Sequence, residues 1–358
     1  MRGVMKAMVL TGHGGLDKYA WHDDWPMPEP GPMEALIRVG ACGLNNTDVN
    51  TRTGWYSKGV TDATTGAAHN EVDGSDPTWG GRPIVFPRIQ GADAVGEVAA
   101  VGAGADSGLI GERVVVDGWQ RDWSEPESMD RAGYFGSEID GGFAEYTACD
   151  VRSLAVVNSK LTDAELATFS CSYTTAEGML NRANAGADDT VLVPGASGGA
   201  GGALIQLAKR RGARVIAMAA EAKHGDMARL GPDLILPRAP DNLRRALEGE
   251  RVTVVADIVG GPLWPALIDI LERGGRYTCS GAIAGPIVTL DLRTFYLRDL
   301  TFTGSTVVPS HVFRDVVGYI ERSEIEPVLA ATHPLRELRA AQQAFIDKRH
   351  VGNIVVVP

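Results

Sequence analysis

The chain has 358 residues, 44% of them hydrophobic, and a formal net charge of -11 at pH 7. This length is typical of two domains, and the acidic charge argues against nucleic-acid or anionic-membrane partners, because both bind basic surfaces. No apolar run reaches the length of about 18 residues that a membrane span needs, and the opening M-R-G-V-M-K-A-M-V-L runs directly into strand-like sequence. We therefore expect neither a membrane span nor a signal peptide.

The four cysteines, Cys42, Cys149, Cys171 and Cys279, lie far apart, and no two of them form a C-x-x-C pair. This spacing excludes a cysteine-rich structural zinc lobe and is not that of a disulfide framework. Cysteines without such a framework are typical of a reducing compartment, so the sequence favours a cytoplasmic protein.

Residues 1–150 are rich in short apolar runs of strand type, such as K-A-M-V-L, E-A-L-I-R-V and E-R-V-V-V, separated by Gly and Pro. Two long polar stretches, residues 57–88 and 118–140, interrupt this pattern, and loops of such length often carry a function. The first stretch contains His69, Glu71 and Asp73 in alternation. Their spacing matches none of the usual zinc motifs, so a solvated acidic loop is favoured over a metal site.

Residues 41–50 read A-C-G-L-N-N-T-D-V-N and follow the strand-like run E-A-L-I-R-V-G. The stretch combines a thiol, amides, a hydroxyl and a carboxylate. A metal site, a metal-free catalytic site and a polar turn all fit this composition, and the stretch alone does not decide between them.

Strand-like and helix-like runs alternate from about residue 160, beginning with V-L-V-P and A-L-I-Q-L-A-K-R-R and ending with R-Y-T-C-S. This alternation predicts an α/β domain in which crossover helices connect the strands of a parallel sheet. After about residue 295 come a strand-like run, two helix-like runs and a final strand, N-I-V-V-V-P.

A glycine-rich turn lies between a predicted strand and a predicted helix in V-L-V-P-G-A-S-G-G-A-G-G-A-L-I-Q-L-A-K, residues 191–209. Glycines let the backbone turn tightly and approach a pyrophosphate, and the helix start offers free N–H groups. The alternative is a turn that only packs helix on strand, but the strand–turn–helix context favours a dinucleotide site. The predicted cofactor contacts are Gly195, Ala196, Ser197, Gly198, Gly199, Ala200 and Gly201.

The next predicted strand, R-V-I-A-M-A, ends near Ala219 without the Asp or Glu that usually binds the ribose of NAD. Without that carboxylate a 2′-phosphate is not repelled, and Lys223 could pair with it. We therefore predict NADP(H) as the cofactor. Two alternatives remain open, since Glu221 could bind the ribose and Lys223 could be an ordinary surface lysine.

Several motifs together resemble the medium-chain dehydrogenase/reductase superfamily over the whole chain, most closely its zinc-independent quinone oxidoreductase and enoyl reductase branch. They are A-C-G-L-N-N-T-D, Q-G-A-D-A-V-G-E-V-A-A-V-G (90–102), G-E-R-V-V-V (111–116), D-G-G-F-A-E-Y (140–146), the glycine turn, D-I-V-G-G (257–261) and V-G-N-I-V-V-V-P. The resemblance implies a GroES-like β-rich catalytic domain from residues 1–156 and 295–358 and a Rossmann domain, a doubly wound parallel sheet, from residues 157–294. We also expect a homodimer, and cofactor contacts from Val259 and Gly281.

The resemblance also bears on the metal. Zinc alcohol dehydrogenases have a Cys ligand where this chain has Asn45, and their His-Glu pair falls on Ala92 and Asp93. Their third ligand falls near Cys171, which matches, although a free Cys is more often a small buried residue. Ala92 cannot bind a metal and Asn45 is a poor zinc ligand, so we predict a metal-free site.

A metal-free reductase needs groups that stabilise and protonate developing negative charge. Amide donation from Asn45 toward a carbonyl oxygen fits this need. By resemblance, Thr47 holds the place of a hydroxyl relay, and Tyr56 lies close to the proton donor of enoyl thioester reductases. Tyr56 could equally be a packing residue, Asp48 is expected to hold the turn, and Arg52 could anchor an anion.

The sequence thus predicts an NADPH-dependent, metal-independent oxidoreductase that transfers a hydride to a quinone or an α,β-unsaturated carbonyl compound. One alternative is an alcohol dehydrogenase that acts on an alcohol, aldehyde or ketone. Another is a crystallin-like protein that binds NADPH with little catalysis.

Overall fold

The alternating apolar runs of the first half form an antiparallel, β-rich part of the molecule. The computed structural model describes residues 3–67 and 83–358. The main sheet of the β-rich part has the order β10-β6-β5-β3-β18-β17, and β9 also pairs with β3. Its strands are β3 (Glu34–Gly43), β5 (Asp93–Val101), β6 (Arg113–Val116), β9 (Tyr146–Asp150), β10 (Leu154–Val156), β17 (Leu329–Pro334) and β18 (Asn353–Val357).

Within the described residues, this part also has two smaller sheets and two α-helices. The smaller sheets have the orders β2-β1-β4 and β7-β8. Their strands are β1 (Val4–Leu10), β2 (Tyr19–Pro26), β4 (Arg88–Ile89), β7 (Trp119–Gln120) and β8 (Gly133–Tyr134), and the helices are α1 (Asn46–Thr53) and α10 (Leu338–Ile346). A core of buried apolar residues, including Ile37, Phe143 and Leu338, joins the sheets to α10.

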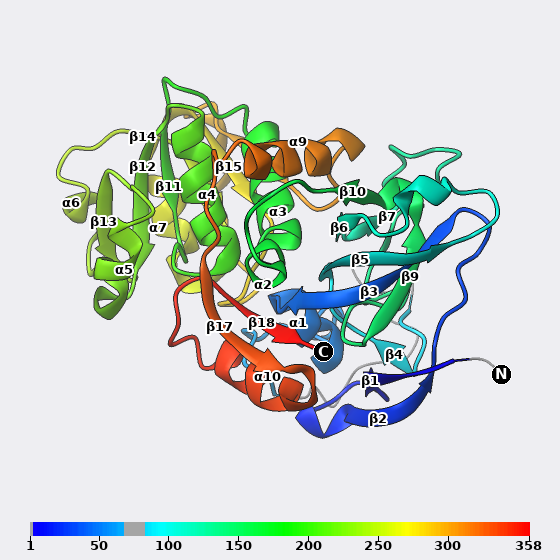
Figure 1. Ribbon diagram of the computed structural model, residues 1–358. Coiled ribbons are helices and arrows are strands. Elements are labelled where there is room, and N and C mark those ends of the chain that lie inside the picture. The colour runs from blue at the N-terminus through cyan, green and yellow to red at the C-terminus, as the bar shows by residue number, and fades with distance from the viewer. Residues whose placement is uncertain (1–2, 68–82) are drawn as a thin grey trace.

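The second part is the predicted α/β domain, and Figure 1 shows it beside the β-rich part. Its sheet has the order β13-β12-β11-β14-β15-β16, and every neighbouring pair is parallel. Its strands are β11 (Thr190–Val193), β12 (Arg214–Ala219), β13 (Leu234–Pro237), β14 (Val252–Asp257), β15 (Leu271–Cys279) and β16 (Thr301–Gly304). The sequence analysis placed the end of this domain at residue 294, whereas β16 extends its sheet to Gly304.

Helices connect and cover the parallel strands, as the strand–helix alternation predicted. They are α2 (Asp163–Leu166), α3 (Ser170–Arg182), α4 (Gly199–Arg210), α5 (His224–Ala228), α6 (Leu243–Ala246), α7 (Trp264–Asp269), α8 (Leu292–Tyr296) and α9 (Ser310–Glu321). Buried side chains of α3, α4 and α9, such as Met179, Leu204 and Phe313, share one core with β11 and β12. No helix in the described part of the chain has the length and apolarity that crossing a membrane requires.

The C-terminal segment returns to the β-rich part and lies between the two parts in Figure 1. β18 pairs antiparallel with the end of β3, where Val355 is opposite Gly43 and Val356 is opposite Cys42. Just before β18, the Gly352 N–H donates to the carbonyl of Ser197 in the glycine turn at 2.9 Å. The glycine turn and the A-C-G-L-N-N-T-D stretch therefore both adjoin this returning segment.

Candidate active site

The polar stretch after β3 forms the start of helix α1. Asn45 has an extended backbone at the N-cap position, and its N–H donates to the Asp48 carboxylate at 2.8 Å. This local bond confirms the predicted turn-holding role of Asp48. The helix ends at Gly54, whose φ of 75° is a left-handed conformation that suits glycine. The chain therefore presents Asn45 and Thr47 at one end of α1 and Tyr56 just beyond the other end.

Asn45 and Asp93 form a buried hydrogen-bonded pair. The Asn45 Nδ2 donates to one oxygen of Asp93 at 2.8 Å, and the Cys171 backbone N–H donates to the other oxygen at 2.5 Å. Burial raises the pKa of Asp93 to about 7, although both hydrogen bonds act in the opposite direction. Burial also raises the pKa of Asp48 to about 7, and the nearby Asp93 adds to that rise. Asp93 thus fixes the orientation of the Asn45 amide, a contact that the sequence analysis missed.

Tyr56 lies within a small polar network. Its phenol forms hydrogen bonds with the side chains of Asn50 and Thr47, and burial raises its pKa to about 12. The Cys171 thiol lies near Tyr56 and shares a hydrogen bond with Tyr134. Burial raises the pKa of both Cys171 and Tyr134, so this thiol and this second phenol are neutral at physiological pH. Asn45 is linked to Cys171 through Asp93, because the Asn45 side chain and the Cys171 backbone N–H donate to the same carboxylate. The three predicted catalytic residues therefore lie around Cys171.

A metal site needs several ligand side chains close together. No group of three or more His, Cys, Asp or Glu side chains within residues 3–67 and 83–358 could hold a metal ion. Ala92 instead packs in a cluster of buried apolar residues with Trp119 and Tyr134. The H-x-E-x-D pattern of residues 69–73 lies outside the described residues.

The predicted glycine turn connects β11 to α4, as the sequence analysis expected. Gly195 has a φ of 67°, and a Cβ on Gly201 would lie 2.4 Å from the Gly195 carbonyl oxygen. A larger residue at either position would strain the backbone or clash with it. The turn ends at the start of α4, where helical N–H groups can receive a phosphate.

Two further loops accompany this turn at the carboxyl ends of the parallel strands. The Val259 side chain after β14 reaches the glycine turn, since a Cβ on Gly195 would lie 2.7 Å from Val259 Cγ2. The loop after β15 contains Gly281 and is tied to Val259 by a 2.8 Å hydrogen bond from the Ala284 N–H to the Val259 carbonyl. Both predicted contacts thus lie along the edge where a dinucleotide binds in folds of this type. Their roles stay predictions.

Lys223 lies beside the glycine turn and a second lysine. Its Nζ donates to the carbonyls of Lys348 at 2.6 Å and His350 at 2.7 Å, and to the Ser197 hydroxyl at 3.4 Å. Burial, together with the charge of Lys223, lowers the pKa of Lys348 to about 7. Burial and the nearby Arg238 lower the pKa of Lys223. Two cationic side chains thus lie close together beside the glycine turn, an arrangement that favours binding of an anion.

Lys348 is the functional candidate that the sequence analysis missed. Its Nζ donates to the Asn46 side-chain oxygen at 2.9 Å, so it joins the start of α1 to the Lys223 region. The only sequence signal is the basic run K-R-H just before the motif V-G-N-I. Basic runs of this kind are common on protein surfaces. The sequence therefore could not predict that this run lies beside the glycine turn, and only the tertiary structure shows it.

The structure corrects one interpretation of the sequence, the role of Arg52. Its sequence position allows a role as an anchor for an anion, but the side chain is fully buried. It donates to the Gly14 carbonyl at 2.5 Å and to the Gln342 side chain at 2.7 Å. It therefore joins α1 to the N-terminal loop and α10 and takes no part in substrate binding.

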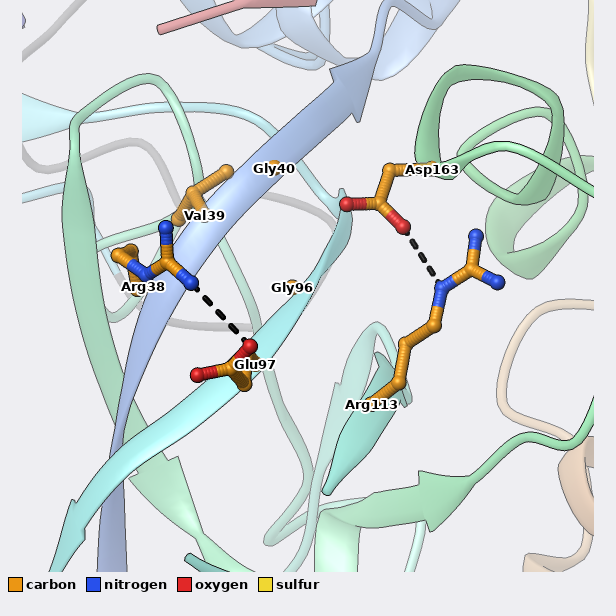
Figure 2. Close-up of a pocket in the computed structure, with 7 residues that line it drawn as sticks. All are labelled: Arg38, Val39, Gly40, Gly96, Glu97, Arg113 and Asp163. Atoms are coloured by element: carbon orange, nitrogen blue, oxygen red, sulfur yellow. Dashed lines mark hydrogen bonds and ion pairs between the residues drawn. The ribbon is translucent and has the colours of Figure 1, made fainter. Parts of the chain in front are cut away.

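A small hollow of about 150 Å3 lies away from these groups (Figure 2). Ion pairs of 3.1 Å between Arg38 and Glu97 and of 2.7 Å between Arg113 and Asp163 neutralise its lining. It lies further along β5 than Asp93, which is at the start of the strand. We therefore assign the candidate active site to the polar network at α1 and not to this hollow.

Comparison with known proteins places this geometry in a family. The chain matches the model of the alcohol dehydrogenase GroES-like domain over residues 31–159 and that of zinc-binding dehydrogenases over residues 199–322. It is 45% identical to a structurally solved candidate alcohol dehydrogenase from Sinorhizobium meliloti 1021, with a TM-score of 0.90 and coverage of 100% of this chain and 98% of that chain. The chain belongs to the medium-chain dehydrogenase/reductase superfamily.

Curated relatives of this medium-chain dehydrogenase/reductase include reductases. An acryloyl-coenzyme A reductase from Metallosphaera sedula is 28% identical, with 98% of this chain and 99% of the relative covered. An NADPH-dependent alkenal/one oxidoreductase from Arabidopsis thaliana is 25% identical, with 99% of this chain and 80% of the relative covered. The protein is an NAD(P)H-dependent oxidoreductase with a GroES-like domain and a Rossmann-type domain.

The second family model is named for zinc, but the residues present here do not fit that metal. At the three positions that correspond to zinc ligands, the Asn45 amide is bonded to Asp93, Ala92 has no donor atom, and Cys171 is a neutral thiol bonded to Tyr134. Zinc requires deprotonated thiolate, imidazole or carboxylate ligands, usually four in a structural site and three in a catalytic one. We therefore derive no catalytic step through a metal.

Proposed function

We propose that this medium-chain dehydrogenase/reductase reduces α,β-unsaturated carbonyl compounds or quinones with NADPH and without a metal. The observation that carries the proposal is the Tyr56 network, in which a phenol held by Thr47 and Asn50 lies near Cys171 and the Asn45–Asp93 pair. Amide and phenol donors at one place are the groups that such a reduction needs in the absence of a Lewis acid. The printed names of the relatives that reduce acryloyl-CoA and alkenals support the same substrate class.

Bound NADPH would supply a hydride to the substrate carbon in the β position of the unsaturated carbonyl group. Negative charge then develops on the carbonyl oxygen. Asn45 can stabilise it, because an amide nitrogen carries two hydrogens and Asp93 accepts one of them. Tyr56 would give its phenolic proton to the α carbon, so that one C–H bond forms as the O–H bond breaks. A proton from solvent, passed through the Thr47 hydroxyl, would restore the phenol.

Lys223 and Lys348 support the preference for NADPH. Lys223 follows β12, whose last residue is Ala219, and the Glu221 side chain near it is exposed. Burial and the charge of Lys223 together lower the pKa of Lys348, and a 2′-phosphate beside the two side chains would favour the charged form of both. We therefore propose that both lysines bind this phosphate.

Lys223→Ala is expected to weaken NADPH binding by roughly one to two decades, because losing a charge-assisted contact costs about 1.5–3 kcal/mol. NADH lacks the phosphate, so its dissociation constant should change little. Fluorescence titration of both cofactors would measure this, with the exposed Lys160→Ala variant as a matched control. Equal weakening of NADPH and NADH binding would show that Lys223 does not recognise the 2′-phosphate.

Metal analysis of the purified protein is expected to find far less than one zinc per chain, because Asn45, Ala92 and Cys171 do not provide a zinc ligand set. Treatment with a chelator should leave turnover unchanged. One tightly bound zinc per chain whose removal abolishes activity would instead favour the alternative of an alcohol dehydrogenase with unusual ligands.

A substrate panel tests the proposed function as a whole. NADPH oxidation would be followed with an enoyl thioester, an enone, an alkenal, an ortho-quinone and a saturated aldehyde. We expect turnover of one or more unsaturated carbonyl compounds or of the quinone, and slow or no reaction with the saturated aldehyde. A preference for the aldehyde would favour an alcohol dehydrogenase, and NADPH binding without turnover of any of them would favour the crystallin-like alternative.

We further propose that the protein is a cytoplasmic homodimer. β16 ends the order of its sheet, so its outer edge has no strand partner within the described residues. The adjoining segment exposes apolar side chains, among them Ile287, Leu292 and Tyr296. An open strand edge next to apolar surface suits pairing with a second copy. Light scattering of the purified protein would measure the assembly state.

A further inference from the structure

The segment that follows Tyr56 crosses from the β-rich part to the cofactor-binding part. The Thr64 N–H donates to the Ile283 carbonyl at 2.9 Å, and Ile283 lies two residues after Gly281 in the loop that follows β15. The Thr64 hydroxyl donates to the Asn50 side-chain oxygen Oδ1 at 3.0 Å. Thr64 is therefore held by the α/β domain and in turn contacts a buried amide in α1.

Other contacts fix the same segment on α1. The Trp55 indole N–H donates to the Asp62 carbonyl at 2.8 Å, and the Arg52 guanidinium donates to the Gly66 carbonyl at 3.5 Å. The Trp55 ring also packs edge-on against Tyr56, with ring centroids 5.6 Å apart. These anchors on both sides of Thr64 give its hydroxyl a defined place over Asn50.

The amide of Asn50 can present either a donor or an acceptor to Tyr56. A carboxamide has one acceptor oxygen and one donor nitrogen. The Thr64 hydroxyl donates to Oδ1, and the hydrogen bond between Asn50 and Tyr56 lowers the pKa of the phenol, which is the effect of a donation to the phenol oxygen, so Nδ2 is the group that donates to Tyr56. A phenol oxygen that accepts from Asn50 directs its own hydrogen elsewhere, toward Thr47 or a substrate. With the amide reversed, Asn50 would accept that hydrogen and compete with the substrate for it.

We propose that Asn50 and Thr64 are positioning residues that orient the Tyr56 hydroxyl as a proton donor toward the substrate. This inference rests on the proposed function, because it specifies how the proton of that reaction is delivered. After the proton leaves, the Asn50 N–H stabilises the remaining phenolate oxygen. The contact with Ile283 makes the arrangement depend on the position of the cofactor-binding part.

Thr64→Val removes the hydroxyl but keeps the shape of the side chain, so the Asn50 amide is free to reverse. We expect kcat for an unsaturated carbonyl substrate to fall about 3- to 10-fold, the range for one neutral hydrogen bond. KM should change little, and the solvent deuterium isotope effect on kcat should rise, because proton transfer becomes slower. Thr64→Ser keeps the hydroxyl and should restore both values. Thr65→Val changes an exposed neighbour and is the matched control.

Asn50→Asp replaces the donor nitrogen with an acceptor oxygen of the same shape. It should lower kcat for the unsaturated carbonyl by about 10²-fold or more, the lower range for the loss of a proton donor. Quinone turnover is the internal control, since a reduced quinone takes its protons from water. Equal losses with both substrates, or no change in kcat and in the isotope effect for Thr64→Val, would overturn the proposal.

A titration separates this inference from the proposed function, because it needs no substrate. The ultraviolet absorbance of the Tyr56 phenolate is obtained from the difference between the protein and its Tyr56→Phe variant. Thr64→Val should move this titration to higher pH, since the phenolate loses the Asn50 donor. An unmoved titration contradicts the inference even if the enzyme reduces enones. A shift in a protein that turns over no substrate of the panel supports the inference and contradicts the proposed function.

Discussion

Tyr56→Phe is expected to lower turnover of an α,β-unsaturated carbonyl compound by about 10²–10⁴-fold, the usual contribution of a positioned general acid. The phenol has hydrogen bonds to Asn50 and Thr47, and burial raises its pKa to about 12, so it carries its proton throughout the physiological range. Removing the hydroxyl leaves the ring in contact with Trp55, so cofactor binding should not change. Steady-state kinetics and NADPH titration measure the two quantities separately.

Tyr146, a half-buried residue of β9 outside the polar network, provides a matched control, and Tyr146→Phe should retain full activity. A quinone as substrate provides a second control, because its reduced form can take protons from water. Loss of activity with the unsaturated carbonyl but not with the quinone would identify Tyr56 as the proton donor. Near-normal turnover of the unsaturated carbonyl by Tyr56→Phe would show that the proton comes from another group.

Asn45→Ala is expected to raise the activation barrier by about 2.7–4 kcal/mol, a factor of roughly a hundred to a thousand in kcat, if its amide stabilises the developing oxyanion. Asp93 accepts one amide hydrogen at 2.8 Å and fixes the orientation of the side chain. The other hydrogen is the one that can be donated to a substrate oxygen. The loss should affect quinones and unsaturated carbonyls alike, because both develop charge on oxygen.

A structural effect of this substitution must be separated from the catalytic one, since Asn45 is also the N-cap of α1 and the partner of Asp93. Thermal unfolding and NADPH affinity of Asn45→Ala would be compared with those of the unaltered protein. Folded Asn45→Ala with normal cofactor affinity and normal kcat would contradict the role. Large losses at both Asn45 and Tyr56 indicate carbon–carbon double-bond reduction, whereas loss at Asn45 alone indicates quinone-type chemistry.

The sequence by itself determined the features that depend on neighbouring residues. The glycine turn could be located because a strand-like run, glycines and a helix-like run follow one another directly, and β11 and α4 confirm it. The end of β12 at Ala219 could likewise be predicted, because the run of strand-forming residues ends there. Asp48 could be assigned to the turn at Asn45 because side-chain capping acts over three residues.

The tertiary structure alone decided the contacts between distant residues. The pairs Asn45–Asp93, Lys223–Lys348 and Thr64–Ile283 join positions that the sequence separates widely. It also showed that Arg52 is buried, although the sequence of a polar helix predicts an exposed arginine. Periodicity and capping describe interactions within one element, whereas these contacts arise only when β3 pairs with β5, the C-terminal segment returns to β3 and the two parts of the molecule pack together. The residue types predicted the chemistry, and the packing of the chain decided which of them meet.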